Sequence, residues 1–407
     1  MKCRHCAAEL KLDFCDLGFS PPSNAYLSAA DLSRPEVTYP LRVKVCENCW
    51  LVQTEDFAKH DELFSADYAY FSSTSTSWLA HAKAYVDMIV PRLGLGAKSL
   101  VVEIASNDGY LLQYVDQKGI PCLGVEPTAS TAEAARKLGL RVESPFFGAE
   151  SARMLLEKYG HADLIAGNNV LAHVPDINDF LTGMHILLAP QGTVTVEFPH
   201  LLRLIVEHQF DTIYHEHFSY LSLLAVARVF EHVGMRVYDV EKLPTHGGSL
   251  RVYACQKEAD LQTRPAVAAL LAEEKAAKLD SAAGYEGFQA EADAVRFGLT
   301  AFLLEQRLAG KTVMGYGAAA KGCTLLNYAG IDGKLLPMVA DAAPSKQNKF
   351  LPGSHIPIVT PETLVAAKPD FVVILPWNLK KEVTESMKVI REWGGKFVVA
   401  VPALEVW

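Results

Sequence analysis

The chain has 407 residues, 50% hydrophobic and 21% charged, which suits about two to four packed domains and excludes a disordered chain. Its formal charge of −9, from 38 basic and 47 acidic residues, argues against nucleic acid as the main partner, because such a surface needs a basic face. No apolar run approaches the roughly 20 residues that span a membrane, and the start, MKCRHCAAEL, has no signal core, so we expect a cytoplasmic protein with no membrane partner.

Two Cys-x-x-Cys pairs lie in the turn-rich residues 1–70. Each pair places two thiolates on one tight turn, and two such turns supply the tetrahedral ligand set that Zn²⁺ prefers. Without a secretory signal, this pattern favours a metal over disulfides. Cys15, between the pairs, is a less favoured ligand. We predict a structural zinc in an N-terminal domain, residues 1–70, with four ligands: Cys3, Cys6, Cys46 and Cys49.

Residues 71–258 alternate helical patterns with short apolar strands, which indicates a parallel sheet covered on both faces. The expected strands are 99–105, 122–126, 162–166 and 193–198, with helices from near 77, at 131–138 and at 177–188. Two last strands, 236–240 and 249–254, have only a Gly-rich loop between them and should pair antiparallel. The prediction is a mostly parallel sheet with an antiparallel last strand.

The turn after the first of these strands, in VVEIASNDGY, has no G-x-G-x-x-G signature, which speaks against NAD here. Glu103 is placed to receive a ligand ammonium, and Glu126, ending the next strand, to bind a ribose hydroxyl pair. Together with the antiparallel pair, these acids predict S-adenosylmethionine (SAM). The cofactor-binding candidates are Glu103, Ser106, Asn107, Gly109, Glu126, Asn168 and Asn169.

The run DTIYHEHFSY, residues 211–220, follows the fifth strand, where a substrate loop would lie. A histidine is a good base near neutral pH, Glu216 could orient one, and Tyr214 could donate a hydrogen bond to an enolate oxygen. The His-x-His pair could instead bind a metal, or the aromatics could simply pack. Catalysis is the favoured interpretation. His173, in a loop after the fourth strand, is a further candidate.

Residues 259–407 begin helix-rich and continue as a second α/β unit. Its loop MGYGAAAKG, between a strand and a helix, suits a phosphate, and Lys321 could add charge. Asp341, after the next strand, keeps an NAD-like interpretation open. The substrate-binding candidates are Lys321, His246, Arg251 and Asn378; for the segment THGGSLR a structural hairpin is an equal alternative.

The chain resembles the sugar C-methyltransferases of deoxysugar biosynthesis along its whole length. The segments that carry the resemblance are the paired Cys-x-x-Cys, VEIASNDGYLL, GNNVLAHVPD, IYHEHFSYLS, THGGSLRVY and GYGAAAKG. It implies a zinc-binding domain, a class I SAM-methyltransferase domain at 71–258, and a helical connector with a C-terminal Rossmann-like α/β domain at 259–407.

The resemblance further implies methylation at C-3 of a dTDP-linked 4-keto sugar through an enolate. His217 would be the base, Glu216 and Tyr214 would support it and stabilise the enolate, and His173 and Tyr68 would flank the reacting centre. We expect a monomer. The alternatives are an O- or N-methyltransferase, an NAD-dependent oxidoreductase of nucleotide sugars, or a zinc-ribbon module that binds nucleic acid.

Overall fold

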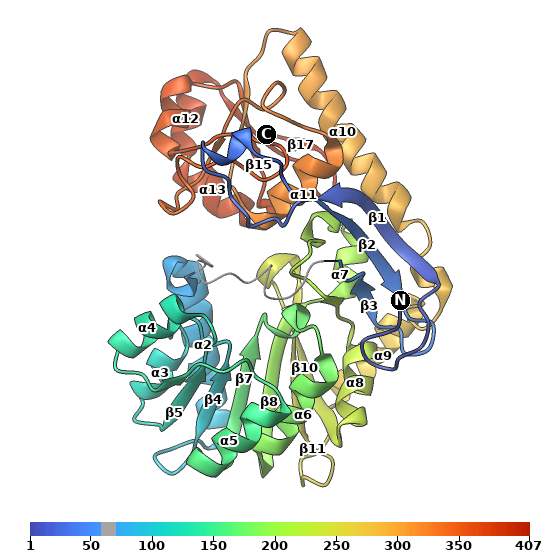
Figure 1. Ribbon diagram of the computed structural model, residues 1–407, viewed down its shortest axis with the longest axis vertical. Helices are drawn as coiled ribbons and strands as arrows, with labels where there is room; N and C mark the ends of the chain where they lie inside the picture. The colour runs from blue at the N-terminus through green and yellow to red at the C-terminus, as the bar shows by residue number, and fades with distance from the viewer. Residues whose placement is uncertain (58–70) are drawn as a thin grey trace.

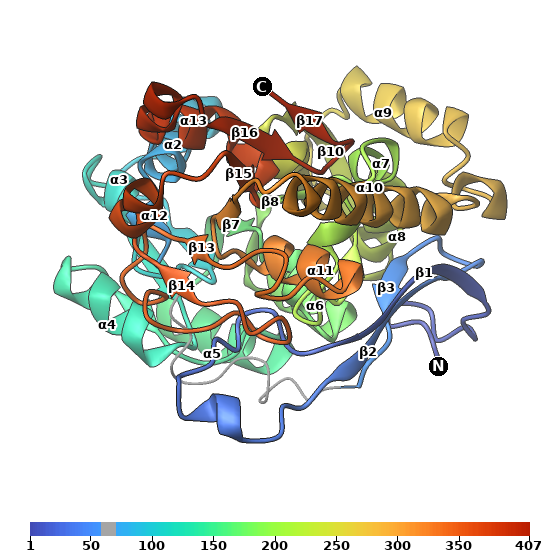
Figure 2. The same cartoon turned by 90° about the horizontal axis from the view of Figure 1, so that it is seen from above.

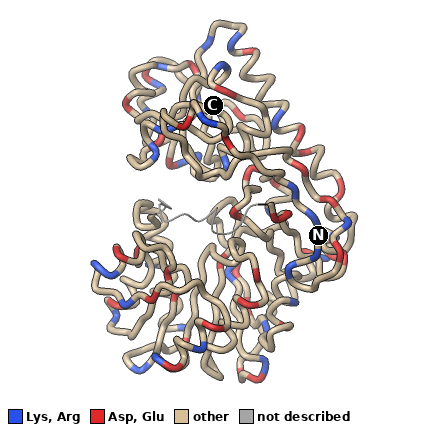
Figure 3. Tube along the Cα trace, in the orientation of Figure 1, with Lys and Arg blue, Asp and Glu red and all other residues tan. Residues whose placement is uncertain are grey.

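The computed structural model describes residues 1–57 and 71–407, which form three sheets in two lobes (Figure 1). The middle of the chain makes the lower lobe in this view, the C-terminal part makes the upper lobe, and the N-terminal strands lie beside both. Lys and Arg are interspersed with Asp and Glu in both lobes (Figure 3). Within the described ranges, no helix combines the length and apolarity needed to cross a membrane.

The seven-stranded sheet of the lower lobe has the order β10-β11-β8-β7-β4-β5-β6. The strand β11 is antiparallel to both of its neighbours, and the other pairings are parallel, so the predicted class I methyltransferase sheet is confirmed. The strands are β4 (Val101–Ile104), β5 (Cys122–Val125), β6 (Val142–Glu143), β7 (Ala162–Asn168), β8 (Leu188–Pro199), β10 (Met235–Leu243) and β11 (Ser249–Gln256).

Helices cover both faces of this sheet because its strands are apolar on both sides. Along β4, Val102 and Ile104 join one core cluster and Val101 joins another. The first cluster includes α5 (Ala149–Tyr159), α6 (Ile177–Leu187) and α8 (Leu223–His232). The second includes α2 (Thr76–Leu93), α3 (Leu112–Asp116) and α4 (Ala129–Lys137).

The N-terminal sheet contains a strand that the sequence did not predict. Its order is β1 (Leu12–Ser20), β2 (Tyr39–Val45), β3 (Val52–Thr54) and β9 (Ser219–Tyr220). The strand β9 belongs to the DTIYHEHFSY run and pairs with β3, Val52 opposite Tyr220. The zinc-binding region and the predicted catalytic run therefore share one sheet.

The C-terminal lobe holds a six-stranded sheet, parallel except for its last strand (Figure 2). The order is β14 (Ile358–Val359), β13 (Val339–Ala340), β12 (Val313–Tyr316), β15 (Phe371–Ile374), β16 (Lys396–Val399) and β17 (Glu405–Val406). Its helices are α11 (Ala320–Ala329), α12 (Pro361–Ala367) and α13 (Lys380–Ser386). The connector contributes α9 (Pro265–Ala276) and α10 (Phe288–Leu308), and α7 (Leu201–Val206) follows β8. One core cluster joins β1 and β2 to α10 and α11, so the N-terminal sheet packs on this lobe as well.

Candidate active site and metal site

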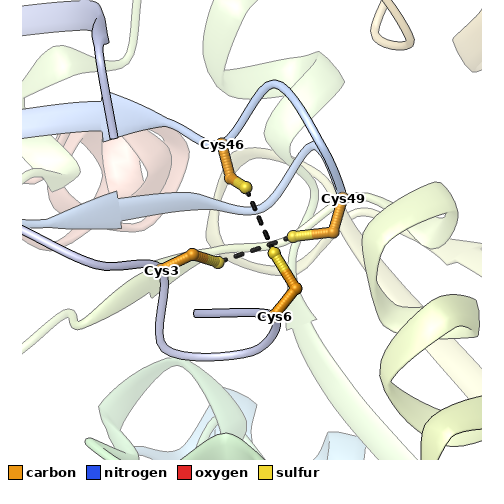
Figure 4. Close-up of side chains that lie close together, drawn as sticks. All are labelled: Cys3, Cys6, Cys46 and Cys49. Atoms are coloured by element: carbon orange, nitrogen blue, oxygen red, sulfur yellow. Dashed lines mark hydrogen bonds between the residues drawn. The ribbon is translucent and has the colours of Figure 1, made fainter. Parts of the chain in front are cut away.

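The four predicted zinc ligands converge at the N-terminal end of the molecule (Figure 4). Their sulfur atoms lie within 4.8 Å of one another; Cys3 and Cys49 are 3.5 Å apart, and Cys6 and Cys46 are 3.4 Å apart. Sulfur atoms of a disulfide lie about 2 Å apart, whereas tetrahedral Zn–S bonds of about 2.3 Å place them about 3.8 Å apart. The cluster therefore fits Zn²⁺.

The two turns that carry these cysteines share one backbone conformation. Ala7 N donates to Cys3 O, and Trp50 N donates to Cys46 O, at 3.0 and 2.8 Å. Ala7 and Trp50 both adopt the left-handed conformation, with φ of 59° and 63°. A buried amide adds a donor to the metal site, because Gln53 Nε2 lies 3.2 Å from Cys3 Sγ. Such donors stabilise thiolates and orient metal ligands. By contrast, Cys15 is buried in the core of the sheet.

Glu103 is the last residue but one of β4, its carboxylate is buried, and neither of its oxygens has a hydrogen-bond partner among the described residues. Burial raises the pKa of Glu103 well above its usual value, opposed in part by the Tyr110 side chain. A buried carboxylate is costly unless a cation or donor compensates it. This orphaned acid at the carboxyl end of the first strand fits the ammonium group of SAM.

Glu126 follows β5 and is held by two backbone donors. Asn107 N donates to its Oε2 at 3.0 Å, and Thr128 N donates to its Oε1 at 2.9 Å. Each carboxylate oxygen can accept more than one hydrogen bond, so the pair of oxygens can still receive a ribose diol. The acid is thus fixed at the carboxyl edge of the sheet, one strand away from Glu103.

The other predicted cofactor residues take different positions around this turn. Asn107 Oδ1 accepts from Ser72 N at 2.9 Å and fastens the segment that precedes α2. A Cβ at Gly109 would lie 2.4 Å from Leu140, so packing as well as a φ of +82° requires glycine there. The remaining three, Ser106, Asn168 and Asn169, keep side-chain atoms without hydrogen bonds among the described residues.

His217 is buried and held in one orientation. Its Nδ1 lies 2.8 Å from Thr212 O, and its Nε2 lies 2.8 Å from Tyr214 Oη. A carbonyl oxygen only accepts, so Nδ1 carries the proton of the neutral ring and Nε2 accepts from the tyrosine. Burial, helped by the neighbouring His173, lowers the pKa of His217 well below its usual value. The ring is therefore neutral, with a basic nitrogen beside a hydroxyl.

The neighbours of His217 are buried titratable groups. The His173 ring lies edge-on to it, with ring centroids 4.6 Å apart, and burial lowers the pKa of His173 to about 4. Glu216 turns its carboxylate toward the N-terminal region, where Asn24 Nδ2 donates to it at 2.7 Å. Burial raises the pKa of Glu216 to about 7. Tyr68, the fifth predicted catalytic residue, lies outside the described residues.

The C-terminal lobe brings two of the predicted substrate residues together. Lys321 Nζ donates to Asn378 Oδ1 at 2.9 Å and lies 4.5 Å from the centre of the Trp377 ring. Burial lowers the pKa of Lys321 to about 8, opposed by Asp211 across the lobe boundary. Trp377 Nε1 donates to Asp211 Oδ2 at 2.7 Å, which joins the two lobes at this point.

The other two predicted substrate residues belong to one hairpin. His246 lies in the loop between β10 and β11, and Arg251 lies in β11. His246 Nε2 lies 3.1 Å from Asn169 Nδ2, so the loop after β7 meets this hairpin. Arg251 pairs instead with the buried Glu197 at 3.1 Å and with Glu241 at 3.2 Å. Its guanidinium is thus engaged in a buried network beneath the site.

Sequence reasoning did not single out three residues that the fold places beside the predicted ones. Asp211 and Thr212 are in the quoted run DTIYHEHFSY, and an acid in the same run as the histidines was the available signal. Asn24 follows Pro21 and Pro22 in an irregular stretch. No local pattern could have linked it to Glu216, which is 192 positions away.

Family models match three successive parts of the chain. A putative zinc binding domain matches residues 3–64, a methyltransferase domain matches 78–240, and a C-methyltransferase C-terminal domain matches 244–402. With the sheet order and the acids at its carboxyl edge, these matches define a SAM-dependent C-methyltransferase that carries a zinc-binding domain.

A curated relative covers nearly the whole chain. The chain is 38% identical to the C-methyltransferase NovU of Streptomyces niveus over 401 residues, 98% of this chain and 95% of the relative. It therefore belongs to the same family of C-methyltransferases.

Solved structures resemble only part of the chain. A SAM-dependent methyltransferase of Anabaena variabilis shows 15% identity, a TM-score of 0.36 and coverage of 44% of this chain and 86% of its own. The magnesium protoporphyrin IX methyltransferase of Synechocystis with bound SAH shows 14% identity, a TM-score of 0.35 and coverage of 44% and 82%.

Proposed function

We propose that the protein methylates C-3 of a dTDP-linked 4-keto deoxysugar, and that it does so by forming an enolate of the sugar. The observation that carries this proposal is the His217–Tyr214 pair. A carbon beside a ketone becomes a nucleophile only when a base removes its proton and a donor stabilises the resulting oxyanion. A neutral, buried imidazole with a hydroxyl 2.8 Å from its basic nitrogen provides both groups.

The proton balance of this pair follows from its hydrogen bonds. When His217 Nε2 takes the C-3 proton, it no longer accepts a hydrogen bond from Tyr214. The tyrosine hydroxyl is then free to donate to the enolate oxygen, while Thr212 O continues to accept from Nδ1 and stabilises the imidazolium. Removal of the proton and stabilisation of the oxyanion are therefore coupled through one hydroxyl group.

The cofactor supplies an activated sulfonium methyl, so the methyl transfer itself needs no metal. Glu103 would bind the ammonium and Glu126 the ribose hydroxyls, with Asn168 and Asn169 at the carboxyl edge beside them. These residues hold the methyl donor on the sheet while the histidines come from the loops above it. Positioning the two reactants in this way contributes a large part of such a rate.

The nucleotide end of the sugar would lie toward the C-terminal lobe. Lys321 is cationic below about pH 8 and is buried next to Asn378 and Trp377, which suits an anionic diphosphate. His246 lies between this group and the cofactor edge, because its loop contacts both Asn169 and Trp377. The sugar would thus lie between the two lobes, with C-3 facing His217.

The decisive experiment incubates the protein in deuterated water with SAM and a dTDP-4-keto-2,6-dideoxyhexose. Mass spectrometry follows methyl gain and solvent exchange at the carbon beside the ketone. The wild type should show both, and exchange should also occur with S-adenosylhomocysteine in place of SAM. In His217→Asn both should fall about 10³-fold, because the base is lost, while SAM binding is retained.

His161→Asn is the matched control, because this exposed histidine lies just before β7 at the opposite edge of the sheet. It should behave as the wild type. Full methylation by His217→Asn would show that His217 is not the base. Absence of both exchange and methyl gain in the wild type, with SAM bound, would reject this sugar class as the acceptor.

A further inference from the structure

Arg4 lies inside the first zinc turn, between Cys3 and Cys6, yet only 5% of its side chain is exposed. It leaves the turn and reaches the loop that precedes α6 of the methyltransferase domain. Its guanidinium donates to Thr54 O at 3.0 Å and to Pro175 O at 3.3 Å, and it lies 4.8 Å from the centre of the Phe218 ring. It also pairs with Asp56.

The groups that Arg4 contacts are neighbours of the two buried histidines. Thr54 Oγ1 donates to His217 O at 2.6 Å, and Thr54 N donates to Phe218 O at 3.1 Å. On the other side, Phe218 N donates to Ala172 O at 2.8 Å, one residue before His173. The guanidinium therefore bridges β3, the His217 segment and the end of the His173 loop.

The rest of the zinc turn is fastened to the same region. His5 Nδ1 lies 2.8 Å from Asn178 Oδ1, and Asn178 Nδ2 donates to His5 O at 2.8 Å. Asn178 is in the first turn of α6, shortly after the His173 loop. On the β3 side, the buried Gln53 accepts from Arg4 N at 2.9 Å and donates to Cys3 Sγ. The docked turn thus contacts both loops and the metal ligands.

We propose that Arg4 is a positioning residue, through which the zinc turn holds the His217 and His173 segments in their relative places. The inference rests on the proposed roles of these histidines and assigns the zinc domain a part in catalysis. A guanidinium presents several donors in a fixed plane, so it can fix two carbonyls and an aromatic ring at once. The zinc in turn fixes the backbone that carries Arg4.

A displacement of about 1 Å at reacting groups can cost about 100-fold in rate, so the contact should be visible in turnover. The test uses the zinc-loaded full chain with SAM and the dTDP-4-keto sugar. In Arg4→Met the stem remains and the donors are lost. We expect kcat and the solvent exchange at C-3 to fall together by about 10- to 100-fold, with KM for both substrates within about twofold.

Two further variants are measured beside Arg4→Met. Arg4→Lys keeps the charge and the stem but not the planar fork, and should lie between Arg4→Met and the wild type. Lys2→Met removes an exposed cation next to Cys3 and should match the wild type. Zinc content by elemental analysis and SAM affinity by calorimetry should be the same in all of them. If Arg4 only stabilised the fold, Arg4→Met would lower the melting temperature and leave kcat unchanged.

Wild-type kcat in Arg4→Met would overturn the inference. So would a loss of kcat that follows a loss of zinc and is restored by adding Zn²⁺, because Arg4 would then serve the metal site only. If Arg4→Met does not fold, Asn178→Ala loosens the same docking from the methyltransferase side and must reproduce the selective fall in kcat. Failure of the proposed base is distinguished by His217→Asn, whose full activity would refute that role whatever Arg4 does.

Discussion

The two α/β lobes contain a turn of the same construction, which follows β4 in one lobe and β12 in the other. In the methyltransferase lobe, Glu126 accepts from Asn107 N, in the turn after β4, and from Thr128 N, two residues further along its own loop. In the C-terminal lobe, Asp341 accepts from Ala318 N, in the turn after β12, at 2.7 Å and from Ala343 N at 2.8 Å. An acid at the end of the second strand thus closes the first turn in both lobes.

What covers each turn differs. In the C-terminal lobe, Tyr26 Oη and Lys346 Nζ both donate to Ala318 O, at 2.6 and 2.9 Å, and Lys346 also lies 3.7 Å from Asp341. A Cβ at Gly317 would lie 2.3 Å from Pro376, so this turn is packed closely. The methyltransferase turn instead retains the buried carboxylate of Glu103, whose two oxygens accept no hydrogen bond of ordinary geometry from the residues that the structure describes.

Turn chemistry alone therefore does not define a cofactor site. Both turns have a strand, a bend and an acid, and both could be interpreted as nucleotide sites from sequence. We propose that a ligand satisfies the acid of the methyltransferase turn, whereas protein groups already hydrogen-bond Asp341 and Ala318 O in the C-terminal turn.

The largest expected difference separates Glu126→Gln from Asp341→Asn. Either amide places an N–H group against a backbone N–H donor, but only Glu126 is proposed to hold the ribose. We expect the Kd for SAM to rise about 10- to 100-fold in Glu126→Gln, since hydrogen bonds to a charged acceptor contribute about 1.5–3 kcal/mol. Asp341→Asn should leave it unchanged. Titration calorimetry decides, and equal effects in both variants would abolish the contrast.

Glu103→Gln tests this buried acid. At a pH where the Glu103 carboxylate is ionised, the substitution should raise the Kd for SAM about tenfold. Because burial raises its pKa, Glu103 is protonated up to a higher pH than an ordinary carboxyl group. The proposed ion pair needs the carboxylate, so the affinity for SAM should increase as the pH rises through that raised pKa. The folded protein should lose stability over the same range, because the charged form is disfavoured by burial.

Calorimetry and thermal unfolding across pH measure both trends. The Gln variant, which cannot ionise, should flatten them. A pH dependence that persists in Glu103→Gln would assign it to another group.

Lys321 should impose an alkaline limit on use of the nucleotide sugar. Its pKa is lowered to about 8, so its positive charge is present below that pH and lost above it. We expect kcat/KM for the sugar to fall about tenfold per pH unit above about 8, with SAM affinity unaffected. Lys321→Arg should remove this fall, because a guanidinium stays charged. If the pH profile of kcat/KM is unchanged in Lys321→Arg, the alkaline limit belongs to another group.

The smallest effect is expected at the cover of the C-terminal turn. Tyr26→Phe removes one of two donors to Ala318 O, which should lower the free energy of unfolding by about 1 kcal/mol. SAM affinity should not change, because Tyr26 covers the C-terminal turn and not the methyltransferase turn. Urea denaturation measures the first quantity. An altered SAM Kd would show that the two turns are coupled.

Much of the molecule was predictable because its signals are local. The apolar strands, the helix that starts at Thr76 and the antiparallel β10–β11 pair follow from hydrophobic periodicity and from the loop that lacks a helix. The four zinc ligands follow from two tight turns. Short edge strands such as β6, β14 and β17 were not foreseen, since two residues carry no periodicity.

The sequence by itself determined the residue types: four thiols, two strand-end acids and a histidine beside a tyrosine. Only the tertiary structure decided how these groups interact. The pairing of β3 with β9, the reach of Arg4 from the zinc turn to Pro175, and the contact of Asn24 with Glu216 join residues far apart in the chain. Burial by distant parts of the chain, which no local pattern encodes, sets the lowered pKa of His217 and the raised pKa of Glu103.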